Sequence, residues 1–580
     1  MISLRNTFMT VYKGRLYPNY WDMIALCLAL SLIFLLAWNA KQMAVPYHLG
    51  QVTAISLKIS NLPGYAVRTV LRMLIAMIFS LLFTFIFATW AAKSHRAGRI
   101  IIPVIDILQS VPVLGFLSIA VVGFIALFPN SMLGPECAAI FVIFTSQAWN
   151  MALGFYQTVS SVPADLGEAA NMFHLSAWQR FWRIDVPFSM PGLLWNMMLS
   201  MSAGWFFVVA SEAVSVANQQ ILLPGIGSYI ATAIMQADVH AILYAILAMF
   251  IVILLYDQII FRPLIAWSDK FKAEQVSQDK EVHSWVVDML HRTRLLRLLG
   301  TLFANLFDAF VNISFFRSKP KSYAHIVQMM RYEVLMVWIF NIILVTALIG
   351  ALLFLGHYIF LVIPFSAIEH VFYLGLITAL RVFVCIIVCS LIWVPIGIWV
   401  GLRSDVAKYV QPLAQFLAAF PANLLYPLFV VAIIKYHLNV NIWLTPLMIL
   451  GTQWYVLFNV IAGASVIPKD LLQVADNLGV SYFLRWRRLL LPGVFPYYIT
   501  GAITAVGGAW NASIVAEVVS WGDKKLVATG LGAYISEYTA AGDFIHIALG
   551  IGMMCILVLF FNRLIWRPLY VLAQERYELD

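Results

Sequence analysis

Long apolar stretches recur along this chain and constrain its fold more than any other feature. A helix rises about 1.5 Å per residue, so about 20 apolar residues cross the hydrocarbon core of a membrane. The sequence is 62% hydrophobic and 11% charged, whereas soluble domains carry about 25% charged residues. We therefore expect an all-α polytopic membrane protein with about twelve spans. The expected spans are 21–40, 66–92, 101–128, 137–155, 188–214, 241–261, 334–355, 372–400, 413–434, 442–461, 494–519 and 545–564.

The distribution of Lys and Arg gives the expected orientation. Twelve spans put both termini on one side of the membrane. If that side is the cytoplasm, 28 of the 36 Lys and Arg residues fall in cytoplasmic segments, as the positive-inside rule requires. The net charge of +9 is then a consequence of topology. It indicates membrane lipids as a partner and argues against nucleic acid.

The two halves of the chain resemble each other. A shift of 305 residues superimposes them without a gap from position 149 onward, and upstream the shift is 309. Six spans per half give both copies the same orientation, and a translocation path is then expected at their shared interface. The expected domains are a first repeat at 1–264, a linker at 265–331 and a second repeat at 332–580. The pairs include Arg72 with Arg381, Pro112 with Pro421, Trp205 with Trp510, and Glu212 with Glu517.

The linker differs in composition from both halves. It is first polar and then, from 283 to 316, basic and amphipathic, with leucines every three to five residues beside three arginines. This pattern suits a helix in the inner membrane interface. A simple tether between the halves is the alternative.

A cytoplasmic loop between the fourth and fifth spans carries the same motif in both halves. The first copy reads Glu168-Ala169-Ala170, three residues, His174, nine residues, then Ile184-Asp185-Val186-Pro187; the second reads Gln473-Val474-Ala475, then Gly479, then Leu489-Leu490-Leu491-Pro492 at the same spacing. The motif predicts two short helices joined at a tight turn, with each proline marking the return to the membrane. It resembles the coupling motif of ATP-binding-cassette (ABC) importer permeases.

The resemblance implies two tandem type I ABC importer transmembrane domains in the bacterial inner membrane. Coupling loops at 160–187 and 465–492 would dock on a cytoplasmic ABC ATPase dimer, and a periplasmic or lipid-anchored binding protein would deliver the solute. The chain lacks the phosphate-loop motif Gly-x-x-x-x-Gly-Lys-[Ser/Thr], so ATP and Mg²⁺ would be bound by the partner ATPase, with no cofactor or metal in this chain.

Two departures from the family motif suggest that the halves couple unequally. His174 replaces the turn glycine in the first loop, and Gln473 replaces the acidic residue in the second. If the turn needs a positive φ, His174 is strained.

Within the family, the chain is most similar to the nitrate, sulfonate, taurine and bicarbonate-type permeases. This similarity implies a small anion as solute. The stretches that carry it are 378–382, 395–397, 415–427, 470–496, 509–517 and 530–535.

Arg72 and Arg381, near the outer ends of their spans, are candidates for the solute path because a buried anion needs donors or positive charge. Arginines that snorkel to the interface are the alternative. Pro112 and Pro421 interrupt spans three and nine. They would free backbone amides for a polar cavity, or simply kink the helix.

Trp205, Trp510, Glu212 and Glu517 are further candidates. Each Glu follows its Trp by seven residues, so the two share a helix face. A Glu would repel an anion unless it is bonded to Arg or backbone, which favours a gate or a structural role for the Glu pair.

Two other functions compete with an importer permease. One is an ion-coupled secondary transporter of two six-helix halves, and the other is a scaffold on a permease fold. The repeated coupling loops argue against the first. No catalytic motif is present and the five cysteines lack metal-ligand spacing, so we expect a non-catalytic chain.

Overall fold

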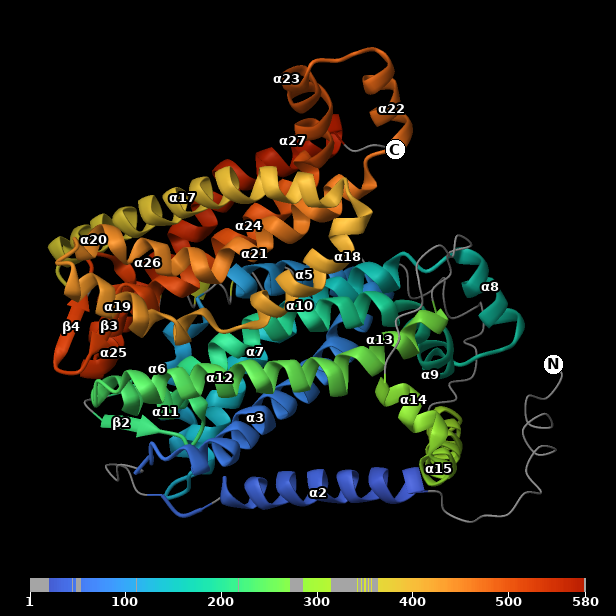
Figure 1. Ribbon diagram of the computed structural model, residues 1–580, viewed down its shortest axis with the longest axis horizontal. Coiled ribbons are helices and arrows are strands. Elements are labelled where there is room, and N and C mark those ends of the chain that lie inside the picture. Colours follow the sequence, from blue (N-terminus) through green and yellow to red (C-terminus); the bar gives the residue numbers. More distant parts are fainter. Residues whose placement is uncertain are drawn as a thin grey trace. The chain divides into compact units, whose positions relative to one another are not determined.

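The computed structural model (Figure 1) describes residues 20–43, 45–47, 54–110, 112–216, 219–271, 285–313 and 363–577, with a few isolated positions between 342 and 356. The chain separates into two compact units, which are described separately. Unit 1 comprises Met1–Trp38, Ser161–Leu194 and Leu255–Lys319. Unit 2 comprises Asn39–Ser160, Trp195–Leu254 and Pro320–Asp580. Both termini lie outside the described residues, so their cytoplasmic position stays a prediction.

Long apolar helices dominate the described part of the chain. Nine of the described helices are long and apolar enough to cross a membrane, and a tenth candidate is the pair Asp405–Ala419 and Ala422–Lys435, bent by 67° at its break. The expectation of an all-α polytopic membrane protein is confirmed. The nine are Tyr20–Gln42, Ile59–Lys93, Leu133–Ser160, Ala177–Glu212, Val239–Ser268, Phe365–Gly401, Val440–Val466, Tyr482–Ala516 and Phe544–Ala573.

Two of the twelve expected spans do not appear as a single described helix. The span expected at 101–128 consists of two helices, α5 (His95–Ser110) and α6 (Val113–Leu127), separated at Pro112. A proline lacks the N–H that would continue the helical hydrogen bonds and its ring collides with the preceding turn, so the interruption expected there is confirmed. The span expected at 334–355 lies outside the described residues except for isolated positions.

The elements of the first half occur in an order that the second half repeats. They are α2 (Tyr20–Gln42), η1 (Ile59–Asn61), α3 (Leu62–Phe83), η2 (Thr84–Ala88), α4 (Thr89–Lys93), α5, α6, α7 (Leu133–Ser160), α8 (Ala164–Met172), α9 (Ala177–Arg180), η3 (Phe181–Asp185), α10 (Val186–Glu212), β1 (Ala213–Val216), β2 (Gln219–Leu222), α11 (Ile226–Met235), α12 (Val239–Tyr256), η4 (Asp257–Phe261), α13 (Arg262–Ser268) and η5 (Asp269–Phe271). The described linker helices are α14 (Trp285–Arg292) and α15 (Arg294–Val311).

The second half follows the same order, with one continuous helix where the first half has α3, η2 and α4. Its elements are α17 (Phe365–Gly401), α18 (Ser404–Ala419), η7 (Ala422–Leu424), α19 (Tyr426–Lys435), α20 (Val440–Trp443), α21 (Thr445–Val466), α22 (Lys469–Asn477), α23 (Tyr482–Arg485), η8 (Trp486–Leu490), α24 (Leu491–Ala516), β3 (Val518–Trp521), β4 (Lys524–Val527), α25 (Leu531–Ala541), α26 (Phe544–Phe561), η9 (Asn562–Trp566) and α27 (Arg567–Tyr577). The π-helical turns η3 and η8 occupy repeat-paired positions, and so do η4 and η9 and the antiparallel hairpins β1–β2 and β3–β4.

Small residues allow the core helices of unit 2 to pack closely. Helices α17, α21 and α24 lie side by side (Figure 1). A Cβ added to Gly501 on α24 would lie 2.7 Å from the carbonyl oxygen of Tyr455 on α21, and one added to Gly463 on α21 would lie 2.8 Å from the Cβ of Tyr497. In hydrocarbon, helices associate through such close contacts.

The two halves also contact each other within unit 2. The side-chain oxygen of Asn511 on α24 accepts a hydrogen bond from the Val113 amide at the start of α6, at 2.7 Å. The carbonyl oxygen of Phe206 on α10 accepts one from the Asn423 side chain, at 3.1 Å. Because the repeat pairs Phe206 with Asn511, the duplication relates the two contacts. Each half therefore places the segment after its proline break against the long fifth helix of the other half.

The close packing of α21 and α24 makes a testable prediction. Gly501→Ala forces the two helices apart and should destabilise the protein by about 1–3 kcal/mol. The matched control is Gly507→Ala on the same helix, where an added Cβ meets no atom within 4 Å. Thermal unfolding of the purified protein in detergent measures both effects. Equal unfolding temperatures for the two variants would contradict a close contact between α21 and α24 at Gly501.

Candidate functional site

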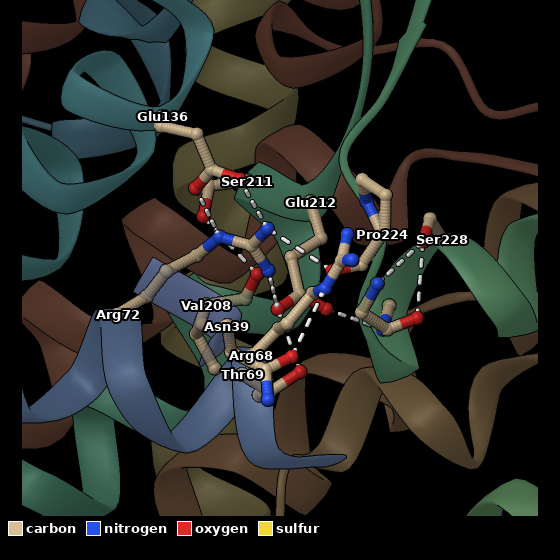
Figure 2. Close-up of polar contacts among 12 residues, drawn as sticks. Asn39, Arg68, Thr69, Arg72, Glu136, Val208, Ser211, Glu212, Pro224 and Ser228 are labelled. Atoms are coloured by element: carbon tan, nitrogen blue, oxygen red, sulfur yellow. Dashed lines mark hydrogen bonds and ion pairs between the residues drawn. The ribbon is translucent and has the colours of Figure 1, made fainter. Parts of the chain in front are cut away.

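A buried polar network in unit 2 joins three helices of the first half (Figure 2). Arg72 on α3 donates from Nη1 to Glu212 Oε1 at 2.6 Å, and from Nε and Nη2 to the two carboxylate oxygens of Glu136 at 2.6 and 2.7 Å. Nη2 also donates to the carbonyl oxygen of Pro224 at 3.0 Å. All three charged side chains are at most 1% exposed. In a dry interior such charges persist only when they are paired and hydrogen-bonded.

Glu212 also caps the next helix. It is the last residue of α10, and the chain returns through hairpin β1–β2 to the start of α11. Glu212 Oε2 accepts a hydrogen bond from the Gly227 amide at 2.6 Å, while the Thr69 hydroxyl donates to Glu212 Oε1 at 2.7 Å and accepts from the Ile226 amide at 3.1 Å. The first amides of a helix have no partner within the helix, and a carboxylate there also complements the helix dipole. One carboxylate thus fixes α3, α10 and α11 together.

This cap explains why Gly225 and Gly530, which the repeat pairs, are both glycine. A Cβ on Gly225 would lie 2.3 Å from the Glu212 carboxylate, and one on Gly530 would lie 2.3 Å from Glu517 Oε2. Only glycine permits so close an approach of backbone to carboxylate.

The second half builds the same network with one substitution. Arg381 Nη1 donates to Glu517 Oε1 at 2.9 Å, and the Thr378 hydroxyl donates to the same oxygen at 2.8 Å. Glu517 Oε2 accepts from the Ala533 amide at 3.0 Å, near the start of α25. Arg381 Nη2 donates at 3.1 Å to Asn441, which takes the place that Glu136 has beside Arg72. With its carboxylates ionised, the first network has a formal charge of −1 and the second is neutral.

The contacts of the two arginines and the two paired glutamates can be compared with the solute, gate and structural roles expected for them. Every charged group of the two pairs is bonded to an opposite charge, and both glutamates are also bonded to backbone amides. The geometry therefore supports the structural alternative for Glu212 and Glu517. Solute contact by Arg72 or Arg381 stays a prediction, although both guanidinium groups are occupied by carboxylates.

Four network residues, Thr69, Glu136, Thr378 and Asn441, are not among the site candidates from the sequence, although a signal was available. Thr69 and Thr378 are related by the upstream shift, three positions before each Arg. Glu136 has no charged counterpart in the second half, where Asn441 takes its place beside the arginine. A paired position at which one member is charged and the other is polar proved as informative as an identical pair.

Pro112 and Pro421 lie at breaks between helices rather than at kinks within them. They precede α6 and η7, with φ and ψ of −64° and 111° for Pro112 and −68° and 110° for Pro421. The Val113 amide that follows Pro112 is bonded to Asn511 of the other half. A freed backbone amide is thus satisfied at the contact between the halves.

Trp205 and Trp510 are both buried, each 1% exposed. Each directly precedes the residue that contacts the other half, Phe206 or Asn511. Solute contact by these tryptophans stays a prediction, and their burial is consistent with packing.

The first coupling loop, in unit 1, has the expected helix–turn–helix form. Helices α8 and α9 are joined at His174, whose φ is +50°. The amides of Phe173, His174 and Leu175 donate to the carbonyls of Ala169, Asn171 and Ala170 at 3.0 Å each. Left-handed backbone is unfavourable for a residue with a side chain. The turn nevertheless adopts a positive φ at His174.

The second coupling loop, in unit 2, repeats this geometry. Gly479 has a φ of +59°, and the amides of 478, 479 and 480 donate to carbonyls 474, 476 and 475, which are the positions that the repeat pairs with those of the first loop. Glu168 and Gln473 are exposed, whereas Ala169 and Ala475 are half-buried and Ala170 is buried.

The prolines that close the two motifs stand at matching irregularities. Pro187 and Pro492 are the second residues of α10 and α24, directly after the π-helical turns η3 and η8. A proline cannot donate the regular helical hydrogen bond, and a π-helical turn is a local departure from that pattern. The return to the membrane expected at each proline therefore coincides with a helix that is locally irregular.

The linker packs against the first coupling loop within unit 1, so it does more than tether the halves. The Trp178 indole donates to the carbonyl of Phe310 at 3.2 Å, and the Gln179 side chain donates to Asn312 at 3.0 Å. The ring of Trp182 lies 5.6 and 5.7 Å from those of Phe307 and Phe310. At the repeat-paired positions of the second loop, Phe483 and Leu484 are 72% and 45% exposed.

Among the described residues, no group of three or more His, Cys, Asp or Glu side chains could hold a metal ion. The expectation of a chain without a resident metal stays a prediction.

Comparison with known proteins identifies the class. Residues 80–262 and 393–567 match the family described as "Binding-protein-dependent transport system inner membrane component". The match covers more than half of the chain and occurs once in each repeat, so the chain belongs to this family. The motif-based resemblance is confirmed, and the chain is a multi-pass transport permease by family.

Three relatives illustrate the range of the family. The bicarbonate transport system permease protein CmpB of Synechococcus elongatus is 30% identical over 135 residues, which are 23% of this chain and 47% of CmpB. The glycine betaine/proline betaine permease protein ProW of Escherichia coli is 26% identical over 203 residues, 34% and 54% of the two chains. The nitrate import permease protein NrtB of Leptolyngbya laminosa is 25% identical over 185 residues, 32% and 63%. The chain thus spans about half the length of the curated relatives it matches.

The two buried networks make a second prediction. Glu517→Ala leaves Arg381 buried without a charge partner and should cost about 3–5 kcal/mol of stability. Glu136→Asn gives the first half the arrangement of the second, since Arg72 keeps Glu212, and should cost far less. Thermal unfolding of the purified variants tests this. An equal loss of stability in both would contradict the conclusion that each buried arginine needs one carboxylate partner.

The linker contact makes a third prediction. Trp178→Ala removes both the hydrogen bond to Phe310 and the ring packing, so the linker should be cleaved faster in limited proteolysis of the folded protein. Phe483→Ala is the matched control, because its ring stands at the paired position and is 72% exposed. Equal cleavage rates in the two variants would show that the linker does not depend on the loop.

Proposed function

We propose that this chain supplies both membrane-spanning halves of the permease of an ATP-driven importer in a bacterial inner membrane. It moves a small solute, an anion of the nitrate, sulfonate or bicarbonate kind, by alternating access. The observation that carries the proposal is the pair of coupling loops, which share their helix–turn–helix geometry, their left-handed turn and their backbone hydrogen bonds. Nothing in a simple channel or scaffold requires two such loops.

The partner that fits these loops is a cytoplasmic ABC ATPase dimer, which binds ATP and Mg²⁺. The second loop exposes apolar side chains, with Leu478, Tyr482 and Phe483 between 72% and 77% exposed. The first exposes Met172 and Phe173, at 79% and 65%. Exposed apolar groups on a loop outside the membrane indicate a protein contact. A periplasmic or lipid-anchored binding protein would deliver the solute, as the family description implies.

An anionic solute is supported by two of the relatives, whose names specify bicarbonate and nitrate, while a third specifies betaines. The alternative of an ion-coupled secondary transporter is weakened by the state of Glu212 and Glu517. Both carboxylates are held by an arginine, a threonine and a backbone amide. A carboxylate so bound is poorly suited to taking up and releasing a proton in each cycle.

The test is the ATP hydrolysis of material purified from native membranes through this chain. Gly479→Pro should uncouple or lose the ATPase, because the turn has a positive φ, which the ring of proline does not allow. Gly479→Asn is the matched control, since asparagine tolerates left-handed backbone. If no nucleotide-binding chain copurifies and uptake follows a proton or sodium gradient, the importer assignment is wrong.

A further inference from the structure

A cavity of about 510 Å³ lies in unit 2 between three segments of the second half: α17, the first turns of α24, and η9. This volume is typical of a ligand site. Nine of its twelve lining residues are aliphatic or phenylalanine. All three segments belong to helices that are long and apolar enough to cross a membrane. The cavity therefore lies within the hydrocarbon core or at its edge.

The cavity opens at the surface of unit 2. Three of its lining side chains, Ile387 and Leu391 on α17 and Leu491 on α24, are between 44% and 72% exposed. An apolar side chain of a membrane helix faces lipid at little cost, since lipid tails are as apolar as leucine. A molecule that enters this cavity would therefore come from the bilayer.

Three polar side chains also line the cavity, those of Ser390, Tyr498 and Trp566. The hydroxyls of Ser390 and Tyr498 lie 2.9 Å apart and join α17 to α24. The indole Nε1 of Trp566 is buried and has no hydrogen-bond partner among the described residues. A buried donor without an acceptor is unfavourable. At the edge of the hydrocarbon core, the acceptor that the bilayer itself offers is an ester carbonyl of a phospholipid.

Four exposed arginines stand next to the cavity-lining residues along the chain, and we call them the basic cluster. They are Arg487, Arg488, Arg563 and Arg567. The first two lie about one helical turn before Leu491, and the other two lie on either side of Trp566. Because α24 packs against η9 and α27, the two pairs belong to neighbouring segments (Figure 1). None of the four takes part in an ion pair within the part of the chain that the structure describes.

The first half lacks this combination of groups. The repeat pairs the three polar residues of the cavity with Leu81, Leu193 and Phe261. It pairs the basic cluster with Trp182, Arg183, Gln258 and Arg262. Of these two arginines, one donates to Asn312 of the linker at 3.4 Å, and the other is paired with Asp257 at 3.4 Å. The polar cavity groups and the unpaired charges thus occur together only in the second half, so the shared fold does not require them.

We propose that the second half binds an anionic phospholipid of the inner leaflet. Its phosphate lies on the basic cluster, an ester carbonyl accepts from the Trp566 indole, and an acyl chain enters the cavity. The charges are complementary, since arginine binds phosphate through strong charge-assisted hydrogen bonds, and basic pockets beside membrane helices on the cytoplasmic side suit such head groups. Only the choice of leaflet rests on the proposed function, because Arg487 and Arg488 lie in the second coupling loop.

The test measures lipid binding to the purified, delipidated full chain in detergent by native mass spectrometry. The probes are dioleoylphosphatidylglycerol and dioleoylphosphatidylcholine, which share their chains and differ in net charge. The wild type should bind the phosphatidylglycerol about tenfold more tightly. Arg563→Gln, which introduces the residue of the first half, should lower that affinity about fivefold and leave phosphatidylcholine binding unchanged. The matched control is Arg403→Gln, which removes an exposed arginine outside the lining segments and should change neither affinity by more than about twofold.

A second pair of variants tests the cavity. Ile387→Trp fills its opening and should lower the affinity for both lipids about tenfold. Ile78→Trp is the matched control, because the repeat pairs the two positions and their side chains are 57% and 58% exposed; it should leave both affinities unchanged.

Equal binding of the two lipids by the wild type would overturn the inference, and so would equal affinities in Arg563→Gln and Arg403→Gln. Equal affinities in Ile387→Trp and Ile78→Trp would show that no acyl chain enters the cavity, which is the result expected if the span predicted at 334–355 covers it. Failure of the importer assignment would appear separately, in the copurification of the ATPase.

Discussion

The requirement that buried charge be paired organises the membrane part of this protein. Arg72 and Arg381 are each placed within an apolar helix, and each is satisfied by the glutamate that ends the long fifth helix of its half. The same glutamate caps the helix after the hairpin. Removing either partner would leave a charge in a dry interior, so helices two and five and the capped helix are held as one body in each half.

The two halves share this arrangement of helices and differ in some of the side chains around it. Glu136 contacts Arg72 in the first half and Asn441 contacts Arg381 in the second, so the two networks differ in charge while each arginine keeps a partner at that site. The turn of the coupling loop keeps a positive φ with histidine in one half and glycine in the other. The two halves thus have the same backbone geometry at these sites, although their side chains differ.

The linker adds a third difference between the halves. Its helix α15 ends against the aromatic residues of the first coupling loop, whereas the paired residues Phe483 and Leu484 of the second loop are exposed. The halves therefore share a fold but differ in what covers their coupling loops. A fused chain makes such a difference stable, because each half always meets the other and not a copy of itself.

The sequence alone determined the membrane class, the duplication, the interruption of two spans at Pro112 and Pro421 and the repeated loop motif, because hydropathy, proline chemistry and motif spacing act over short distances along the chain. Only the tertiary structure decided what the buried charges do. Arg72, Glu136 and Glu212 lie far apart along the chain, and their pairing depends on how helices pack. Neither could the sequence show that Asn511 and Phe206 contact the other half or that the linker covers one loop, since such contacts follow from helix rotation and register in three dimensions.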